Sequence, residues 1–157
     1  MKIRLEPVTV ASRAAVERLE TAPGQEGFVE SVAECLAEAD RRRCWRPVGV
    51  YDGDALIGFA MYGFFPHEGQ DEEMSEGGRV WLDRLLIDAS CQGKGYGKAA
   101  VKALIRRLRQ EYGCRRIFLS VYKENQAACR LYERLGFRFN GETDANGELV
   151  MCKDCTA

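Results

Sequence analysis

The stretch QGKGYGK, at residues 92–98, is the part of this sequence that says most about its fold. It places three glycines and two lysines between an apolar run at 80–87, which predicts a strand, and an amphipathic run at 97–112, which predicts a helix. Glycine allows positive φ angles and leaves backbone N–H groups unobstructed, and the first turn of a helix carries partial positive charge. The turn is therefore predicted to bind a phosphate group. The alternative is a tight strand-to-helix connection with solvated lysines.

Two common phosphate-binding loops are excluded by single residues of this turn. A P-loop would need glycine at position 92 and Ser or Thr at position 99, where the chain has Gln92 and Ala99. A dinucleotide-binding G-x-G-x-x-G would need its third glycine at position 98, which is Lys98. If the turn binds a phosphate, it does so as part of another motif.

Apolar periodicity and turn residues predict the elements on both sides of this stretch. Helices are expected from Ser12, as N-cap, to the break at Pro23 and Gly24, and then at about 28–40, 97–112 and 127–135. Strands are expected at 3–8, 45–51, 55–64, 80–87, 117–121, 137–140 and 149–152. Asp52 and Gly53 favour a hairpin, and the strand-helix-strand order over 80–121 is that of a βαβ unit.

The length and composition favour one domain over residues 1–157. No apolar run reaches the roughly 20 residues of a membrane span, and the N-terminus lacks a signal-peptide pattern, so we expect a cytoplasmic protein with no membrane partner. Seven scattered cysteines argue against a disulfide framework. Cys152 and Cys155 form a C-x-x-C, but it has no second pair and the chain has one histidine, His67, so no metal is expected.

Charge is unevenly distributed, although the net charge is −1. Acidic side chains predominate between residues 17 and 78 and basic ones after residue 79. The basic side chains of 98–116 are not interleaved with aromatic residues and belong to no recognition motif, so no nucleic-acid partner is expected. The acidic part of the chain could attract a cationic partner.

Two motifs together resemble the GCN5-related N-acetyltransferase (GNAT) superfamily. Residues 92–97 match its Q/R-x-x-G-x-G/A signature, and NQAACRLYERLGF at 125–137 is similar to its N-x-x-A-x-x-L-Y-x-x-x-G-F segment. The resemblance is closest to the bacterial spermine/spermidine acetyltransferases associated with multidrug exporters, across 45–66, 78–88 and 136–151. The first 40 residues match less clearly.

The resemblance implies an α/β fold with a mixed, mostly antiparallel sheet of six to seven strands and about four helices on both faces. It implies acetyl transfer from acetyl-CoA to a primary amine, foremost a polyamine such as spermidine or spermine, by direct attack in a ternary complex. A homodimer is possible, since dimers are common in the superfamily. Two alternatives stay open: acetylation of another small amine or a protein N-terminus, and a non-catalytic acyl-CoA-binding sensor.

The resemblance also implies how acetyl-CoA would be bound. The strand before the glycine turn separates from its neighbour at its end, and its backbone pairs with the pantetheine arm. The expected cofactor-binding residues are Leu85, Ile87, Gln92, Gly93, Lys94, Gly95, Tyr96, Gly97, Lys98, Asn125, Ala128 and Tyr132. Asn125 is also well suited to cap the helix that follows it.

Two residues are expected to be catalytic. Tyr132 would protonate the departing thiolate, and Asp83 would act as base through water or bind the cationic substrate. The alternatives are core packing for Tyr132 and an ion pair with Arg84 or Arg79 for Asp83.

The amine is expected to contact carboxylates and apolar walls, because a polyamine alternates ammonium groups with methylenes. The candidate substrate-binding carboxylates are Glu30, Glu34 and Asp83, together with others in the acidic stretch 66–78. Aromatic residues of the second and third strands, among them Trp45 and Tyr62, are candidates for the walls.

Overall fold

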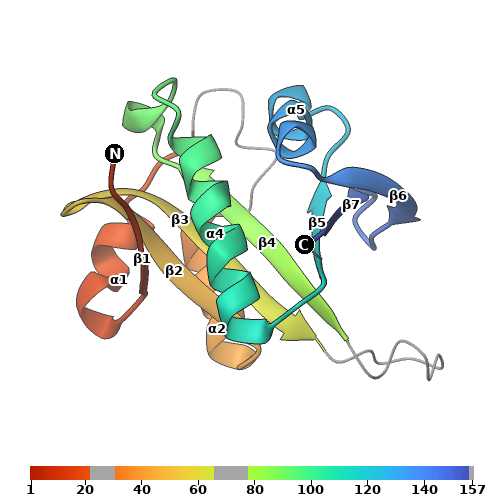
Figure 1. The fold of residues 1–157 in the computed structure, drawn as a ribbon. Coiled ribbons are helices and arrows are strands. Elements are labelled where there is room, and N and C mark those ends of the chain that lie inside the picture. Colours follow the sequence, from red (N-terminus) through yellow and green to blue (C-terminus); the bar gives the residue numbers. More distant parts are fainter. Residues whose placement is uncertain (22–30, 66–77, 156–157) are drawn as a thin grey trace.

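The computed structural model describes residues 1–21, 31–65 and 78–155. These residues form one seven-stranded sheet in the order β1-β2-β3-β4-β5-β7-β6 (Figure 1). The strands are β1 Ile3–Pro7, β2 Trp45–Asp52, β3 Ala55–Phe65, β4 Arg79–Ile87, β5 Arg116–Val121, β6 Arg138–Thr143 and β7 Leu149–Asp154. Every neighbouring pair is antiparallel except β4 and β5. The expected mixed, mostly antiparallel sheet is confirmed.

Helices cover both faces of this sheet. They are α1 Val10–Glu17, α2 Val32–Arg41, α4 Tyr96–Tyr112 and α5 Gln126–Arg134. Side chains of β3 alternate between two buried clusters: Phe59 and Met61 pack with α1 and α2, while Ala60 and Tyr62 pack with α4. The predicted arrangement of helices on both faces is confirmed. In the part of the chain that the structure describes, no helix is long and apolar enough to cross a membrane.

The first helix begins earlier than its predicted N-cap. Its N-cap is Thr9, whose hydroxyl accepts from the Ser12 N–H at 3.3 Å, while the Thr9 N–H donates to the Ser12 hydroxyl at 2.9 Å. This is a reciprocal capping box, in which the second serine or threonine lies three residues inside the helix. The prediction that Ser12 is the N-cap is therefore wrong, because its hydroxyl is the partner of the cap.

Strand β4 has two irregularities that create an opening in the sheet. On the β3 side, Met61 pairs with Arg84 but Tyr62 pairs with Leu82, so Asp83 is the extra residue of a β-bulge. On the β5 side, the ladder consists of the pairs Val80–Ile117 and Trp81–Phe118. Figure 1 shows β4 and β5 diverging from this point, with α5 at the open end. The implied separation of the two strands is thus present.

The glycine turn joins the end of β4 to α4. A single 3-10 turn at Ala89–Cys91 precedes it, and Gly93 and Gly95 adopt φ angles of 76° and 83°. These are left-handed values that glycine adopts without strain. Gly95 is the N-cap of α4 and has no side chain to cap the helix, so the first N–H groups of α4 receive no side-chain cap. The local geometry is that of an anion-binding turn.

Candidate active site

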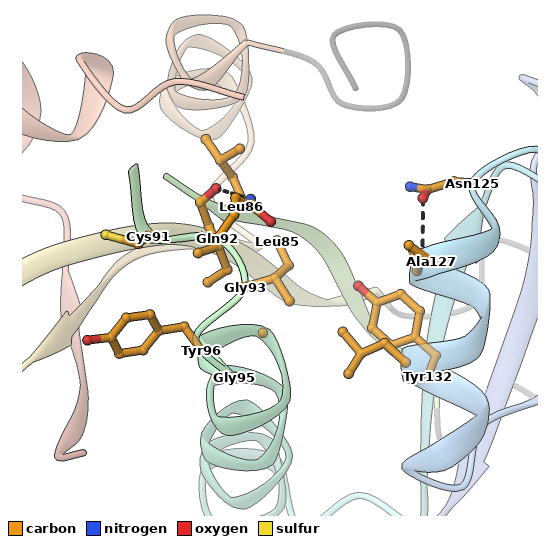
Figure 2. A pocket seen from close by; sticks show the side chains of 14 residues that line it. Leu85, Leu86, Cys91, Gln92, Gly93, Gly95, Tyr96, Asn125, Ala127 and Tyr132 are labelled. Carbon is orange, nitrogen blue, oxygen red and sulfur yellow. Dashed lines mark hydrogen bonds between the residues drawn. The ribbon is translucent and has the colours of Figure 1, made fainter. Parts of the chain in front are cut away.

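A cleft of about 190 Å³ lies where β4 separates from β5, bounded by the end of β4, the glycine turn and α5 (Figure 2). It brings together ten residues that the sequence singled out: Leu85, Ile87, Gln92, Gly93, Gly95, Tyr96, Gly97, Asn125, Ala128 and Tyr132. Four further lining residues were not predicted: Leu86, Cys91, Ala127 and Leu131. These four are apolar or small, and nothing in their sequence pattern separates them from core residues.

The remaining predicted residues lie elsewhere. Lys94 and Lys98 are exposed beside the cleft and do not line it. Glu34 lies in the first turn of α2, away from the cleft, and its N–H donates to the Ser31 hydroxyl that caps this helix. Glu30 lies outside the described residues. Trp45 and Tyr62 are buried in the two cores, so they do not form walls of the cleft.

Side-chain hydrogen bonds fix the glycine turn to the strands beside it. The Gln92 amide nitrogen donates to the Ile87 carbonyl at 2.7 Å, which fixes the turn against the end of β4. The Tyr96 hydroxyl donates to Asp52 at 2.7 Å, and the Lys2 N–H donates to the same carboxylate at 2.8 Å. These bonds lower the pKa of Asp52, so this support stays charged at neutral pH. The backbone N–H groups of the turn remain the donors available to a ligand.

Tyr132 points its hydroxyl into the cleft from α5 (Figure 2). Its ring packs edge-on against the buried Phe137, with 5.7 Å between ring centroids. Burial raises the pKa of Tyr132 to about 12. Among the described residues the hydroxyl has no hydrogen-bond partner. The side chain therefore presents a protonated phenol to whatever fills the cleft.

Asn125 caps α5 and also faces the cleft (Figure 2). Its side-chain oxygen accepts from the Ala128 N–H at 3.3 Å, which confirms the expected N-cap. Because the oxygen is used by the helix, the amide nitrogen is the atom left to donate to a ligand.

Asp83 lies at the β4 bulge and forms an ion pair with Arg84 at 2.6 Å. Arg79 instead pairs with Glu142 at 2.9 Å. Of the two ion pairs that the sequence left open for Asp83, the one with its neighbour is present. Asp83 does not line the cleft, so its expected catalytic role stays a prediction.

A carboxyl pair that the sequence analysis missed lies close to Asp83. Asp144 and Glu148 flank the turn that contains Asn146 and Gly147, and the Glu148 N–H donates to the Asp144 carboxylate at 2.9 Å. Burial and the neighbouring Asp144 carboxyl group raise the pKa of Glu148 to about 7, with a further contribution from the negative charge of Asp83. In the sequence these residues had the ordinary appearance of a hairpin turn.

Comparison with known proteins decides the family. Residues 13–137 match the sequence model of the acetyltransferase (GNAT) family. The chain belongs to this family. It is 47% identical over 154 residues to the spermine/spermidine N(1)-acetyltransferase of Bacillus subtilis strain 168, covering 98% of this chain and 99% of the relative. The resemblance drawn from the two motifs is thereby confirmed.

Other similar proteins are more distant. The mycothiol acetyltransferase of Rhodococcus erythropolis is 34% identical over 110 residues, which cover 64% of this chain and 35% of that protein. Among solved structures, AAC(6')-Ib with paromomycin and acetyl-CoA superposes with a TM-score of 0.80 at 23% identity, covering 99% of this chain and 94% of that one. The PaiA N-acetyltransferase of Thermoplasma acidophilum with coenzyme A gives 0.69 at 16%, covering 98% and 99%. The GNAT fold is shared across these proteins.

Proposed function

We propose that this GNAT acetyltransferase transfers the acetyl group of acetyl-CoA to a primary amine of a polyamine, such as spermidine or spermine, by direct attack in a ternary complex. The observation that carries the proposal is the cleft at the point where β4 leaves β5, with the glycine turn at one end and the Tyr132 hydroxyl at the other. Identity to a Bacillus subtilis enzyme named for spermine and spermidine, over nearly the full length of both chains, supports the polyamine.

The donor side of this site fits acetyl-CoA. The turn at Gly93 and Gly95 offers backbone N–H groups at the positive end of a 17-residue helix, which suits a diphosphate. The backbone of β4 from Leu85 to Ile87 borders the cleft and can pair with the amide groups of a pantetheine arm, as an edge strand pairs with an added strand. The apolar side chains of Leu85 and Leu131 line the same space.

Tyr132 supplies the proton for the leaving thiolate. The thiolate of a thiol with an ordinary pKa, about 8.5, is a weaker base than tyrosinate, but the thiolate that forms as the thioester breaks still gains from a hydrogen-bond donor. A buried phenol with a pKa near 12 keeps its proton until the thiolate develops. The reaction therefore needs a second group that removes a proton from the substrate ammonium.

Carboxylates near the cleft suit a cationic substrate. Asp83 lies at the bulge of β4, beyond the last residue that pairs with β5. A second cavity of about 380 Å³, between α1, α2 and β4, shares Leu86 with the cleft and is bordered by Glu17 and Glu20. Negative groups on two sides can hold the separate charges of one extended polyamine.

A substrate panel tests the proposed amine. Spermidine and spermine should give kcat/KM values at least about tenfold above those of an aminoglycoside, an amino acid and a peptide N-terminus. A flexible polyamine can extend a second ammonium to these carboxylates, whereas an aminoglycoside holds its ammonium groups on rigid rings and the other two amines lack a second one next to a methylene chain. Steady-state acetylation assays with putrescine as an additional comparison measure this. A higher kcat/KM for a non-polyamine would contradict the polyamine assignment, and tight acetyl-CoA binding without transfer to any amine would favour a sensor.

Lys94 and Lys98, beside the turn, should contribute to the affinity for acetyl-CoA and not to the rate of the chemical step. In the Lys94→Ala/Lys98→Ala double variant, the Kd for acetyl-CoA should rise about 3- to 30-fold, since each exposed charge contributes about 0.3–1 kcal/mol at a helix N-terminus. The value of kcat should stay unchanged at saturation. Isothermal titration at two salt concentrations measures the effect, which should shrink at high salt.

A matched variant controls for the loss of charge. Lys102→Ala/Arg106→Ala removes two exposed positive charges from the same helix, one turn or more from the glycine turn. Its Kd should stay within about twofold of wild type. Equal weakening in both variants would mean that the lysines act through overall charge rather than at the turn.

The cellular setting and assembly also belong to the proposal. We place the enzyme in the cytoplasm, where its seven cysteines, none in a disulfide within the part of the chain that the structure describes, would stay reduced. We also propose a homodimer, because β6 is an edge strand that is exposed along its whole length. Sedimentation velocity of the purified protein tests it, and a monomer at all concentrations would contradict it.

A further inference from the structure

Asp88 lies between the end of β4 and the 3-10 turn that leads into the glycine turn. Its backbone N–H donates to the Ile57 carbonyl of β3 at 2.9 Å. One carboxylate oxygen, Oδ2, accepts from the Ser90 N–H at 3.2 Å and also from the Ser90 hydroxyl, so Asp88 is the N-cap of the 3-10 turn. The backbone and the carboxylate of Asp88 are therefore both held in place.

The second carboxylate oxygen of Asp88 binds a segment that lies 68 positions earlier in the chain. Oδ1 accepts from the Glu20 N–H at 2.9 Å, and the Ala89 N–H donates to the Glu20 carbonyl at 2.8 Å. We call these two bonds the Glu20 clamp. Hydrogen bonds from the Ser90 hydroxyl and from the Glu20 N–H lower the pKa of Asp88, so the carboxylate is charged at neutral pH and its bond to Glu20 is charge-assisted.

The clamped segment is a wall of the second cavity. Leu19, Glu20 and Thr21, which follow α1, border this cavity together with residues 31–33 at the start of α2. Leu86 of β4 lines both this cavity and the cleft. Because the Glu20 clamp joins the wall to the two residues that follow β4, it fixes the position of the wall relative to that strand.

The second cavity and the cleft meet at the end of β4. Leu86 belongs to the core cluster packed by α1 and α2, whereas Leu85 and Ile87 contact the cluster under α4. Side chains alternate along a strand, so the side chain of Leu86 borders the second cavity on the face of the sheet opposite to α4. An amine in the second cavity would therefore be separated from the cleft by a single residue of β4.

Glu20 is the carboxylate of this wall that best suits an ammonium group. Both bonds of the clamp use its backbone, so its exposed side chain takes no part in them. Glu17, the other carboxylate of the cavity, forms an ion pair with Arg13 at 3.2 Å, whereas Glu20 forms none with another described residue. An ammonium group at Glu20 therefore displaces no partner within the described part of the chain.

We propose that Asp88 is a positioning residue for the amine: through the Glu20 clamp it holds the Glu20 carboxylate where that group binds the second ammonium of a polyamine. This inference rests on the proposed polyamine acetylation and names the residues that make the enzyme prefer a polyamine to a monoamine. The reacting amine lies at the cleft, and the distant ammonium lies in the second cavity.

The Asp88→Ala variant tests the proposal through substrate preference. Its kcat/KM for spermidine should fall about 10- to 30-fold, mainly through KM, while its kcat/KM for propylamine, which has no second ammonium, should stay within about threefold of wild type. The ratio of the two values is the readout, because a loss of structure would lower both. An equal loss for the two amines would overturn the proposal.

Asp88→Asn should restore the preference for spermidine. The amide oxygen can accept from the Glu20 N–H, while the amide nitrogen can donate to the Ser90 hydroxyl. The ratio of kcat/KM values should return to within about threefold of wild type. A ratio as low as that of Asp88→Ala would mean that the charge of Asp88 matters and the clamp does not, and this would contradict the positioning role.

Asp144→Ala is the matched control. Like Asp88, Asp144 accepts two backbone N–H bonds with its carboxylate, from Asn146 and Glu148 at 2.9 Å each, but it lies between β6 and β7 and lines neither the cleft nor the second cavity. The variant should lose thermal stability to a similar extent and keep the wild-type ratio. The same fall of the ratio in both variants would assign it to general destabilisation and overturn the proposal.

A double-mutant cycle with Glu20→Gln tests whether Asp88 acts through Glu20. Glu20→Gln keeps the clamp and removes the charge, so it should lower the ratio about as much as Asp88→Ala does. The double variant should lose no more than about threefold beyond the larger single loss, because both changes remove the same interaction. Losses that multiply would show independent effects and would count against the proposal.

Binding measurements separate this inference from the proposed function. Isothermal titration of spermidine into the protein saturated with CoA should give a Kd about 10- to 30-fold lower for wild type than for Asp88→Ala. Such binding without acetyl transfer would refute the proposed function and support the inference. Acetyl transfer to spermidine with equal Kd values in the two proteins would refute the inference and leave the proposed function intact.

Discussion

The Tyr132→Phe variant is expected to lower kcat by a factor of about 10² to 10³, with the Kd for acetyl-CoA within about twofold of wild type. The hydroxyl faces the cleft and has no hydrogen-bond partner among the described residues, so its loss removes a proton donor without breaking a structural bond. The ring contact with Phe137 is kept. Because burial raises the pKa of Tyr132 to about 12, the wild-type enzyme should show no alkaline loss of rate from this residue below about pH 10. Single-turnover kinetics at saturating acetyl-CoA measure the chemical step.

Tyr112→Phe is the matched control for this experiment. Tyr112 is a partly buried tyrosine of α4 whose ring stacks on Phe64, away from the cleft. Its replacement should leave kcat within about twofold of wild type. An undiminished kcat for Tyr132→Phe at every pH would remove Tyr132 from the mechanism and leave it as a packing residue.

The Gly95→Ala variant is expected to raise the Kd for acetyl-CoA about 10- to 100-fold. Gly95 has a φ angle of 83°, which costs a residue with a side chain about 1–2 kcal/mol. The strain is relieved if the turn rotates toward negative φ, and the N–H groups at the start of α4 then no longer converge on the diphosphate. Isothermal titration of the purified variant measures the loss.

Gly113→Ala separates cofactor binding from general strain. Gly113 is the C-cap at the other end of α4, with a φ angle of 59°, and a Cβ atom at either glycine would meet no atom within 4 Å. The two variants should therefore lose similar thermal stability, while Gly113→Ala keeps its affinity for acetyl-CoA. Equal affinity in both variants would show that the turn does not bind the cofactor.

A stability measurement tests the raised pKa of Glu148. The folded pKa of about 7 lies above the unfolded value of 4.5, so this group lowers the free energy of unfolding as the pH rises from about 4.5 to 7. Glu148→Gln should therefore melt a few degrees higher than wild type at pH 8, and the gain should vanish as the pH falls toward 4. A lower melting temperature at pH 8 would mean that the carboxylate stabilises the fold.

The glycine turn and the helices beside it were predictable because their signals are local. Gly93 and Gly95 have the positive φ angles that the sequence suggested, and Asn125 caps α5 as its position before Ala127 indicated. The predicted N-cap was wrong at α1, where Thr9 and Ser12 form a capping box. Ser12 has the residue type of an N-cap, but Thr9 is the N-cap and Ser12 is its partner inside the helix. Such pairs are decided by backbone geometry.

The parts of the site that depend on strand register could not be predicted from local pattern. The bulge at Asp83 arises from how β3 pairs with β4, and the cleft joins residues of β4 and α5 that are far apart in the sequence. Aromatic residues gave the opposite error, since Trp45 and Tyr62 looked suited to a substrate wall but are buried in the two cores. An aromatic side chain in a central strand packs against side chains of the strands on both sides, and a single sequence does not reveal which strands these are.

A crystal structure of the protein with acetyl-CoA tests the central claim most directly. The diphosphate should lie on the backbone N–H groups between Gly93 and Gly97, the pantetheine arm should pair with β4 beside Leu85 and Ile87, and the thioester sulfur should lie within hydrogen-bond reach of the Tyr132 hydroxyl. A cofactor bound with its diphosphate elsewhere, or with its sulfur remote from Tyr132, would contradict the account.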